Sequence, residues 1–162
     1  NIEGYASLRD VFFDVCMHQI VRTDLREGLA KEDFYHSLII HDIEKGRYGQ
    51  TAHRRFSFFH KEEQKHIARS YLQLLKTGNY PEEFRRVMLR LYPKVFIYEN
   101  NETAYELLVY LGVEESGEER ERTAFLREMF LPMQETVHWF YAHHFGIIGV
   151  DETMVVDEMV IF

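Results

Sequence analysis

The sequence has few cysteines, which cross-link a chain, and few prolines, which interrupt its helices. Its one cysteine, Cys16, cannot form a disulfide within the chain, and the neighbouring Val15 and Met17 indicate a buried thiol rather than a nucleophile. Three prolines among 162 residues favour long helices over a turn-rich sandwich. No apolar run approaches the roughly 20 residues of a membrane span, and no secretory hydrophobic region opens the chain. These absences predict a cytoplasmic protein with no membrane partner.

Positive charge is scarce as well. The chain has 27 acidic and 19 basic residues and a formal net charge of −8, which argues against nucleic acid as a partner of this domain. Two basic clusters, residues 53–55 and Arg85–Arg86 with Arg90, are interpreted as solvated helix faces rather than phosphate-binding patches. What the chain has instead is apolar: hydrophobic residues make up 46% and aromatic residues 15%, enough for the core of a single domain over residues 1–162.

The spacing of apolar residues and helix-ending residues predicts a mainly helical fold, a helical bundle with a small β addition. Short strands are expected at 95–98 and 154–162. Gly46 and Gly49 are expected to end one helix, and Pro132 to kink another. The helices are expected over residues 5–22, 31–45, 51–76, 81–92, 102–111 and about 117–144, with a connection at 24–28.

Two Glu-x-x-His pairs, Glu63–His66 and Glu135–His138, are the most informative feature of the chain. On a helix, positions i and i+3 share a face, so each pair would place a carboxylate beside an imidazole. Glu63 falls in the middle of the apolar side of its predicted helix, where a carboxylate needs a partner, a proton or a metal ion. Two such pairs facing one another would supply much of a dinuclear metal site, whereas a buried hydrogen bond without metal is the competing interpretation of each pair.

Further ligands are expected from neighbouring helices. Glu32 or His36 is predicted to lie level with Glu63, while Glu102 and Glu106 are interpreted as mostly solvated. A mononuclear alternative uses one helix alone, with zinc or iron held by His60, Glu63 and His66. The candidate metal ligands are therefore Glu32, His36, His60, Glu63, His66, Glu135 and His138.

The two pairs resemble the pattern of the ferritin-like superfamily, in particular rubrerythrin-like di-iron carboxylate bundles. In that pattern a lone Glu, a Glu-x-x-His, a second lone Glu and a second Glu-x-x-His come from successive helices. Over about residues 30–145, the resemblance makes Glu32 the first lone glutamate and Glu102 or Glu106 the second. It implies an up-down bundle that holds iron, or alternatively manganese, and an oxidoreductase that acts on dioxygen or peroxide, or a protein that handles iron. Pro93, Pro132 and the extra leading helix depart from the pattern.

Two other classes of protein fit the same composition. The chain also resembles the ligand-binding and dimerisation region of TetR-like transcriptional regulators, whose DNA-binding head would precede Asn1. The two Glu-x-x-His pairs would then be polar groups of an effector pocket for a small molecule. A third interpretation is a helical scaffold in which residues 154–162 add a strand to a second copy and give a homodimer.

Overall fold

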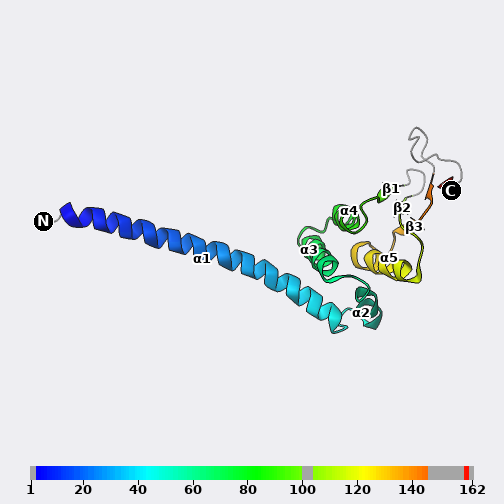
Figure 1. Cartoon of the computed structure of the whole chain (residues 1–162), viewed down its shortest axis with the longest axis horizontal. Helices are drawn as coiled ribbons and strands as arrows, with labels where there is room; N and C mark the ends of the chain where they lie inside the picture. Colours follow the sequence, from blue (N-terminus) through cyan, green and yellow to red (C-terminus); the bar gives the residue numbers. More distant parts are fainter. Residues whose placement is uncertain (1–2, 100–103, 146–158, 161–162) are drawn as a thin grey trace. The chain divides into compact units, whose positions relative to one another are not determined.

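The computed structural model describes residues 3–99, 104–145 and 159–160 (Figure 1). It is mainly helical and contains a small three-stranded sheet. The chain divides into two compact units, residues 1–38 and residues 39–162, and the division falls inside the first helix.

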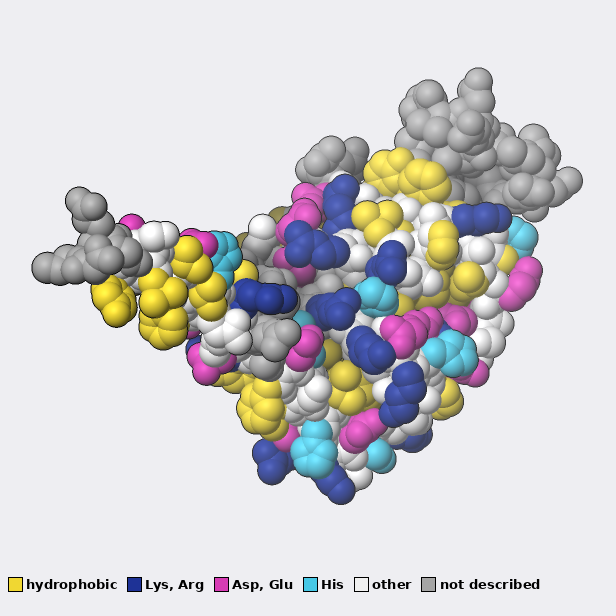
Figure 2. Space-filling model, turned by 60° about the vertical axis from the view of Figure 1, so that its left-hand side comes forward, with side chains coloured by type: hydrophobic (Ala, Val, Ile, Leu, Met, Phe, Trp, Pro, Cys, Tyr) yellow, Lys and Arg dark blue, Asp and Glu magenta, His cyan; other side chains and the backbone are white. Residues whose placement is uncertain are grey.

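Most of the first unit is one uninterrupted helix, α1 (Glu3–Glu44), whose last residues belong to the second unit. The predicted break at residues 24–28 is therefore wrong. Gly28 costs only about 1 kcal/mol within a helix, and Leu25, Glu27 and Leu29 around it favour the helical state. Apolar side chains are exposed along this helix, as the yellow surface in Figure 2 shows, among them Tyr5, Leu8, Val11, Phe12, Phe13, Val15, Ile20, Val21 and Leu25.

None of the helices in the described part of the chain has both the length and the apolar character needed to cross a membrane.

The helices of the second unit follow the predicted order, except that one predicted helix is divided and the helix expected over 102–111 is replaced by a strand. After the turn at Gly46 and Gly49, which both have positive φ, the helices are α2 (Gln50–Phe56), α3 (Lys61–Thr77), α4 (Tyr80–Leu91) and α5 (Gly117–Phe130). The single helix predicted over residues 51–76 is interrupted between α2 and α3. The Gln64 side-chain amide donates to the carbonyls of Phe56 and Phe59, at 3.2 and 3.0 Å, and so satisfies backbone groups at the break.

The sheet consists of β1 (Phe96–Glu99), β2 (Glu106–Tyr110) and β3 (Thr136–Phe140), in that order. Strands β1 and β2 are antiparallel, whereas β2 and β3 are parallel. The helix predicted over 102–111 is wrong, because burial alternates along β2 with the period of a strand. The final helix is also shorter than predicted: α5 ends at Phe130, and the chain enters β3 after Pro132.

The predicted β additions are partly visible. Strand β1 confirms the strand expected at 95–98. Within the predicted 154–162 strand, β5 (Met159–Val160) pairs in parallel with β4 (His144–Phe145), while residues 154–158 and 161–162 lie outside the described residues. A ferritin-like up-down bundle is not confirmed, since strands occupy the segments that were expected to form its last helices.

The core of the second unit lies among the helices and the sheet. Phe125 on α5 packs against both Phe56 and Phe59, with ring centroids 5.5 Å apart in each pair. This aromatic cluster joins α2 and α5 next to the start of α3. Other fully buried side chains include Ile43, Ile67, Phe84, Met88, Val109, Leu111, Leu126 and Phe130.

Candidate functional site

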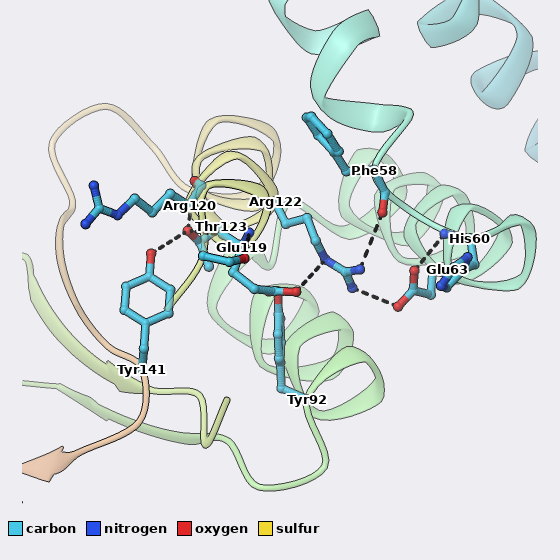
Figure 3. A network of polar contacts seen from close by, with 10 residues as sticks. Phe58, His60, Glu63, Tyr92, Glu119, Arg120, Arg122, Thr123 and Tyr141 are labelled. Carbon is cyan, nitrogen blue, oxygen red and sulfur yellow. Dashed lines mark hydrogen bonds and ion pairs between the residues drawn. The ribbon is translucent and has the colours of Figure 1, made fainter. Parts of the chain in front are cut away.

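The first Glu-x-x-His pair lies at the start of α3, where Glu63 has two structural partners (Figure 3). Its Oε2 accepts a hydrogen bond from the backbone N–H of His60 at 2.7 Å, which caps the helix. Its Oε1 accepts from Nη2 of Arg122 at 2.8 Å. The carboxylate predicted to point into the core is therefore compensated by a helix end and a guanidinium from α5.

Arg122 is the centre of this network. Its guanidinium lies 4.7 Å from the centroid of the Phe59 ring, and its Nε lies 3.5 Å from Oε1 of Glu119. The Tyr92 hydroxyl donates to Oε2 of the same Glu119 at 2.6 Å. Burial, and then this hydrogen bond, raise the pKa of Tyr92 well above its usual value. Sequence reasoning missed Arg122, although its position beside Thr123 and Phe125 on the buried face of α5 is a signal that could have found it.

The other candidate ligands from the helices have different surroundings. His66 Nε2 accepts from Nε of Arg90 at 3.3 Å, and burial followed by Arg90 and Arg69 lowers the pKa of the imidazole. Glu32 and His36 belong to the first unit, where His36 Nδ1 lies 3.9 Å from Oδ1 of Asp33.

The second Glu-x-x-His pair is not helical. Glu135 precedes β3 and His138 lies within it. His138 Nε2 lies 2.7 Å from Oε1 of Glu106, which comes from the neighbouring strand β2. Glu106, interpreted from the sequence as mostly solvated, is therefore part of a close acid–imidazole pair.

Glu135 is a buried carboxylate with a phenol as its partner. The residue is only 6% exposed, and its Oε1 accepts a hydrogen bond from the Tyr80 hydroxyl at 3.1 Å. This hydrogen bond is the main cause that raises the pKa of Tyr80. Nη2 of Arg127 donates to the backbone carbonyl of Glu135 at 3.2 Å and helps to hold the segment before β3. Sequence reasoning identified Glu135 but not Tyr80, which is distant in the chain.

Glu106 and Glu135 line the same cavity, which has a volume of about 670 Å³. The cavity lies where the start of α4 meets β1, the start of β2 and the segment before β3. Four carboxylates and one arginine contribute to its lining: Glu82, Glu99, Glu106, Glu135 and Arg85. Within the described part of the chain, neither Glu99 nor Glu135 has a basic side chain within 4.0 Å. The cavity is therefore strongly acidic.

Aromatic side chains also contribute to the lining. Tyr80, Phe84 and Tyr105 all border the cavity. Tyr105 has a φ of 63°, a left-handed conformation that is uncommon for a residue other than glycine. The backbone N–H of Thr136 donates to the Tyr105 carbonyl at 2.8 Å, which helps to hold this conformation beside the cavity.

The structure does not bring the two Glu-x-x-His pairs to one centre. No group of three or more His, Cys, Asp or Glu side chains among residues 3–99, 104–145 and 159–160 could hold a metal ion. The iron, manganese or zinc site and the TetR-like alternative stay predictions from the sequence. Comparison with protein-family models, with curated proteins and with solved structures found no match for the chain.

Proposed function

We propose that the second unit binds a small organic cation, one that carries ammonium or guanidinium groups, in the acidic cavity at the start of α4. The observation that carries this proposal is Glu135, which is 6% exposed, lines the cavity and has a tyrosine rather than a base as its side-chain partner. A buried carboxylate is costly unless positive charge or hydrogen bonds compensate it. A cationic ligand would supply the missing charge.

The hydrogen bonding of Glu135 supports the same conclusion. The Tyr80 hydroxyl donates to Oε1 of Glu135 at 3.1 Å. The hydrogen bond occupies one oxygen and leaves Oε2 for a ligand ammonium group. Glu99, at the end of β1, gives a second carboxylate on the same cavity, so a ligand with two positive groups gains more than one with a single charge.

The remaining lining suits the organic part of such a ligand. Tyrosine and phenylalanine rings attract cations through their faces and also cover methylene groups. A volume of about 670 Å³ is within the usual range for small-molecule sites. The His138–Glu106 pair fixes the orientation of a further carboxylate.

This proposal keeps the small-molecule partner that the sequence indicated, together with Glu135 and His138. It does not depend on a DNA-binding head, and it assigns the carboxylates to an organic cation rather than to iron. Glu63 is left out, because both of its oxygens already accept hydrogen bonds.

A set of ligands of equal chain length and different charge tests the proposal. Thermal unfolding and calorimetric titration would compare 1,4-diaminobutane with 1,4-butanediol and succinate, and spermidine would test the gain from a third amine. We expect the amines to bind and to raise the unfolding temperature, with spermidine ahead, while the diol and the dicarboxylate have no effect. Equal shifts with the diamine and the diol, or none with any amine, would overturn the proposal. Stoichiometric binding of Fe²⁺, Mn²⁺ or Zn²⁺ in the same assay would instead support the metal prediction.

A further inference from the structure

A second depression, of about 370 Å³, lies between the side chains of α3 and α4 and shares no lining residue with the acidic cavity. Each helix contributes residues at positions i, i+3 and i+4, which share one helix face. Figure 2 shows Lys and Arg side chains gathered on one face of the molecule. The lining residues of the depression are His66, Arg69 and Ser70 from α3, and Arg86, Leu89 and Arg90 from α4.

The arginines of this depression are short of acidic partners. Arg86 pairs with Glu83 at 2.8 Å, but Arg69 and Arg90 have no carboxylate within 4.0 Å among the described residues. A shortage of acids is not the reason, because the chain has 27 acidic and only 19 basic residues. Elsewhere in the second unit arginines do have such partners, and Arg55 Nε lies 2.6 Å from Glu121. Arg69 and Arg90 are both exposed and line the same depression, so an anion bound there would reduce the repulsion between their charges.

His66 orients one of these groups. Arg90 donates from Nε to His66 Nε2 at 3.3 Å, so the imidazole acts as the acceptor. Burial and the two arginines lower the pKa of His66, which keeps the ring neutral and able to accept at neutral pH. The terminal nitrogens of Arg90 are then left without a hydrogen-bond partner in the described part of the chain.

We propose that the depression between α3 and α4 binds the phosphate group of a small phosphate monoester. Guanidinium groups match the geometry of phosphate oxygens and bind them through paired hydrogen bonds. Leu89, which is 54% exposed, offers apolar surface to the organic part of the ligand. A depression of about 370 Å³ on a chain of net charge −8 suits one phosphate group with a small substituent rather than a length of nucleic acid. Arg86 and Arg90, interpreted from the sequence as part of a solvated face, thus acquire a specific role.

Calorimetry at fixed ionic strength tests this site with glucose 6-phosphate, inorganic phosphate and a short single-stranded DNA. We expect glucose 6-phosphate to bind, and Arg69→Gln and Arg90→Gln each to weaken that binding at least tenfold. Arg85→Gln removes the same charge from α4 at a position that does not line the depression. The affinity of this variant for glucose 6-phosphate should therefore stay within about twofold of the wild-type value. If inorganic phosphate binds as tightly as the ester, the phosphate group alone is the ligand. Tighter binding of the ester shows that the organic part contributes, and both results support the site.

Three results would overturn this inference. The first is that neither phosphate compound binds. The second is that the wild type, Arg69→Gln and Arg90→Gln bind glucose 6-phosphate with equal affinity. The third is that only the DNA binds. Circular dichroism of each variant excludes misfolding as the cause. Because the acidic cavity shares no lining residue with this depression, Glu135→Gln should leave phosphate binding unchanged, and each proposal can therefore fail without the other.

Discussion

At the scale of single residues, the half-buried Glu63 and the buried Glu135 show two ways to compensate a carboxylate. Glu63 has the guanidinium of Arg122 and a helix end, whereas Glu135 has one phenol and a cavity. The first arrangement is complete within the chain and stabilises the fold. The second leaves charge uncompensated, which is the reason for assigning the ligand to Glu135.

The Arg122 network makes a direct prediction about stability. Arg122→Ala removes the cation shared by Glu63 and Glu119, and we expect it to lower the free energy of unfolding by about 3 kcal/mol. Urea denaturation followed by circular dichroism measures this loss. Arg120→Ala is the matched control on the same helix, because Arg120 is exposed and, among the residues that the structure describes, pairs only with the exposed Glu115. A loss for Arg122→Ala no larger than that of the control would show that the network is not needed.

Two tyrosines predict how stability changes at alkaline pH. Burial raises the pKa of Tyr71 to about 12, and burial also raises the pKa of Tyr92, from a usual value of 10.0 for both. As pH rises above 10, the unfolded chain loses these protons while the folded chain keeps them. The free energy of unfolding therefore falls through this pH window, and the stabilisation is fully present below pH 10.

Absorbance titration of tyrosinate measures this effect. Tyr71→Phe and Tyr92→Phe should each remove one group that ionises late. Ionisation of all ten tyrosines together near pH 10 in the folded protein would contradict the assignment.

The sequence predicted part of the site because burial of a carboxylate can be inferred from its apolar neighbours. Glu63 and Glu135 were identified in this way. Their partners Arg122 and Tyr80 could not be, because each lies more than fifty residues away and only the fold brings them together. The close approach of His138 and Glu106 likewise depends on the pairing of β2 with β3, which the helical interpretation had excluded.

At the scale of elements, helices with strong end signals and the short strand β1 were predicted well, whereas β2 and β3 were not. α4 has Asn79 before its first residue and Pro81 in its first turn, and its predicted range agrees with the structure. Around β3, apolar side chains run through Val137, Trp139 and Phe140, and such a run fits a buried helix as well as a strand. Continuous apolar character therefore hid the sheet from sequence reasoning.

A substitution at Gly112 tests the conformation of the turn that follows β2. Its φ is +69°, and a Cβ there would lie 2.8 Å from Cβ of Lys94. We expect Gly112→Ala to lower the free energy of unfolding by about 1–2 kcal/mol, because both the conformation and the space oppose a side chain. Gly117→Ala is the control, since a Cβ at this first residue of α5 meets nothing within 4 Å. Urea denaturation curves that coincide for the two variants would contradict the description of this turn.

The exposed apolar side chains of α1 predict that copies of the chain associate. Phe12 and Phe13 are 69% and 65% exposed, and a helix with apolar side chains on many sides is usually covered in its native state. We expect a second copy to provide this cover, through a contact different from the strand addition predicted at 154–162. In sedimentation velocity, the wild type should be a dimer or larger, and Phe12→Glu combined with Phe13→Glu should shift it toward the monomer. Leu75→Glu, at an exposed apolar position on α3, should not. A monomeric wild type throughout the micromolar range would refute this expectation.

At the scale of the whole molecule, opposite charges occur in separate places on a chain of net charge −8. The start of α4 borders the acidic cavity, and its last turns border the basic depression. This distribution follows the helix dipole, which favours acids near a helix N-terminus and bases near its C-terminus. Composition predicted the mainly helical character and the overall charge, but the separation of charge into two sites follows only from the packing of α3, α4 and the sheet.

The central claim is that the charge of Glu135 recognises an organic cation, and calorimetric titration of spermidine into three proteins tests it most directly. Glu135→Gln keeps the shape of the side chain and an acceptor for Tyr80 while it removes the charge. Glu114→Gln makes the same change of net charge at an exposed position outside the cavity. We predict that the dissociation constant rises at least tenfold in Glu135→Gln, a loss of about 1.4 kcal/mol or more, and stays within about twofold in Glu114→Gln. Equal dissociation constants for the three folded proteins would contradict the claim.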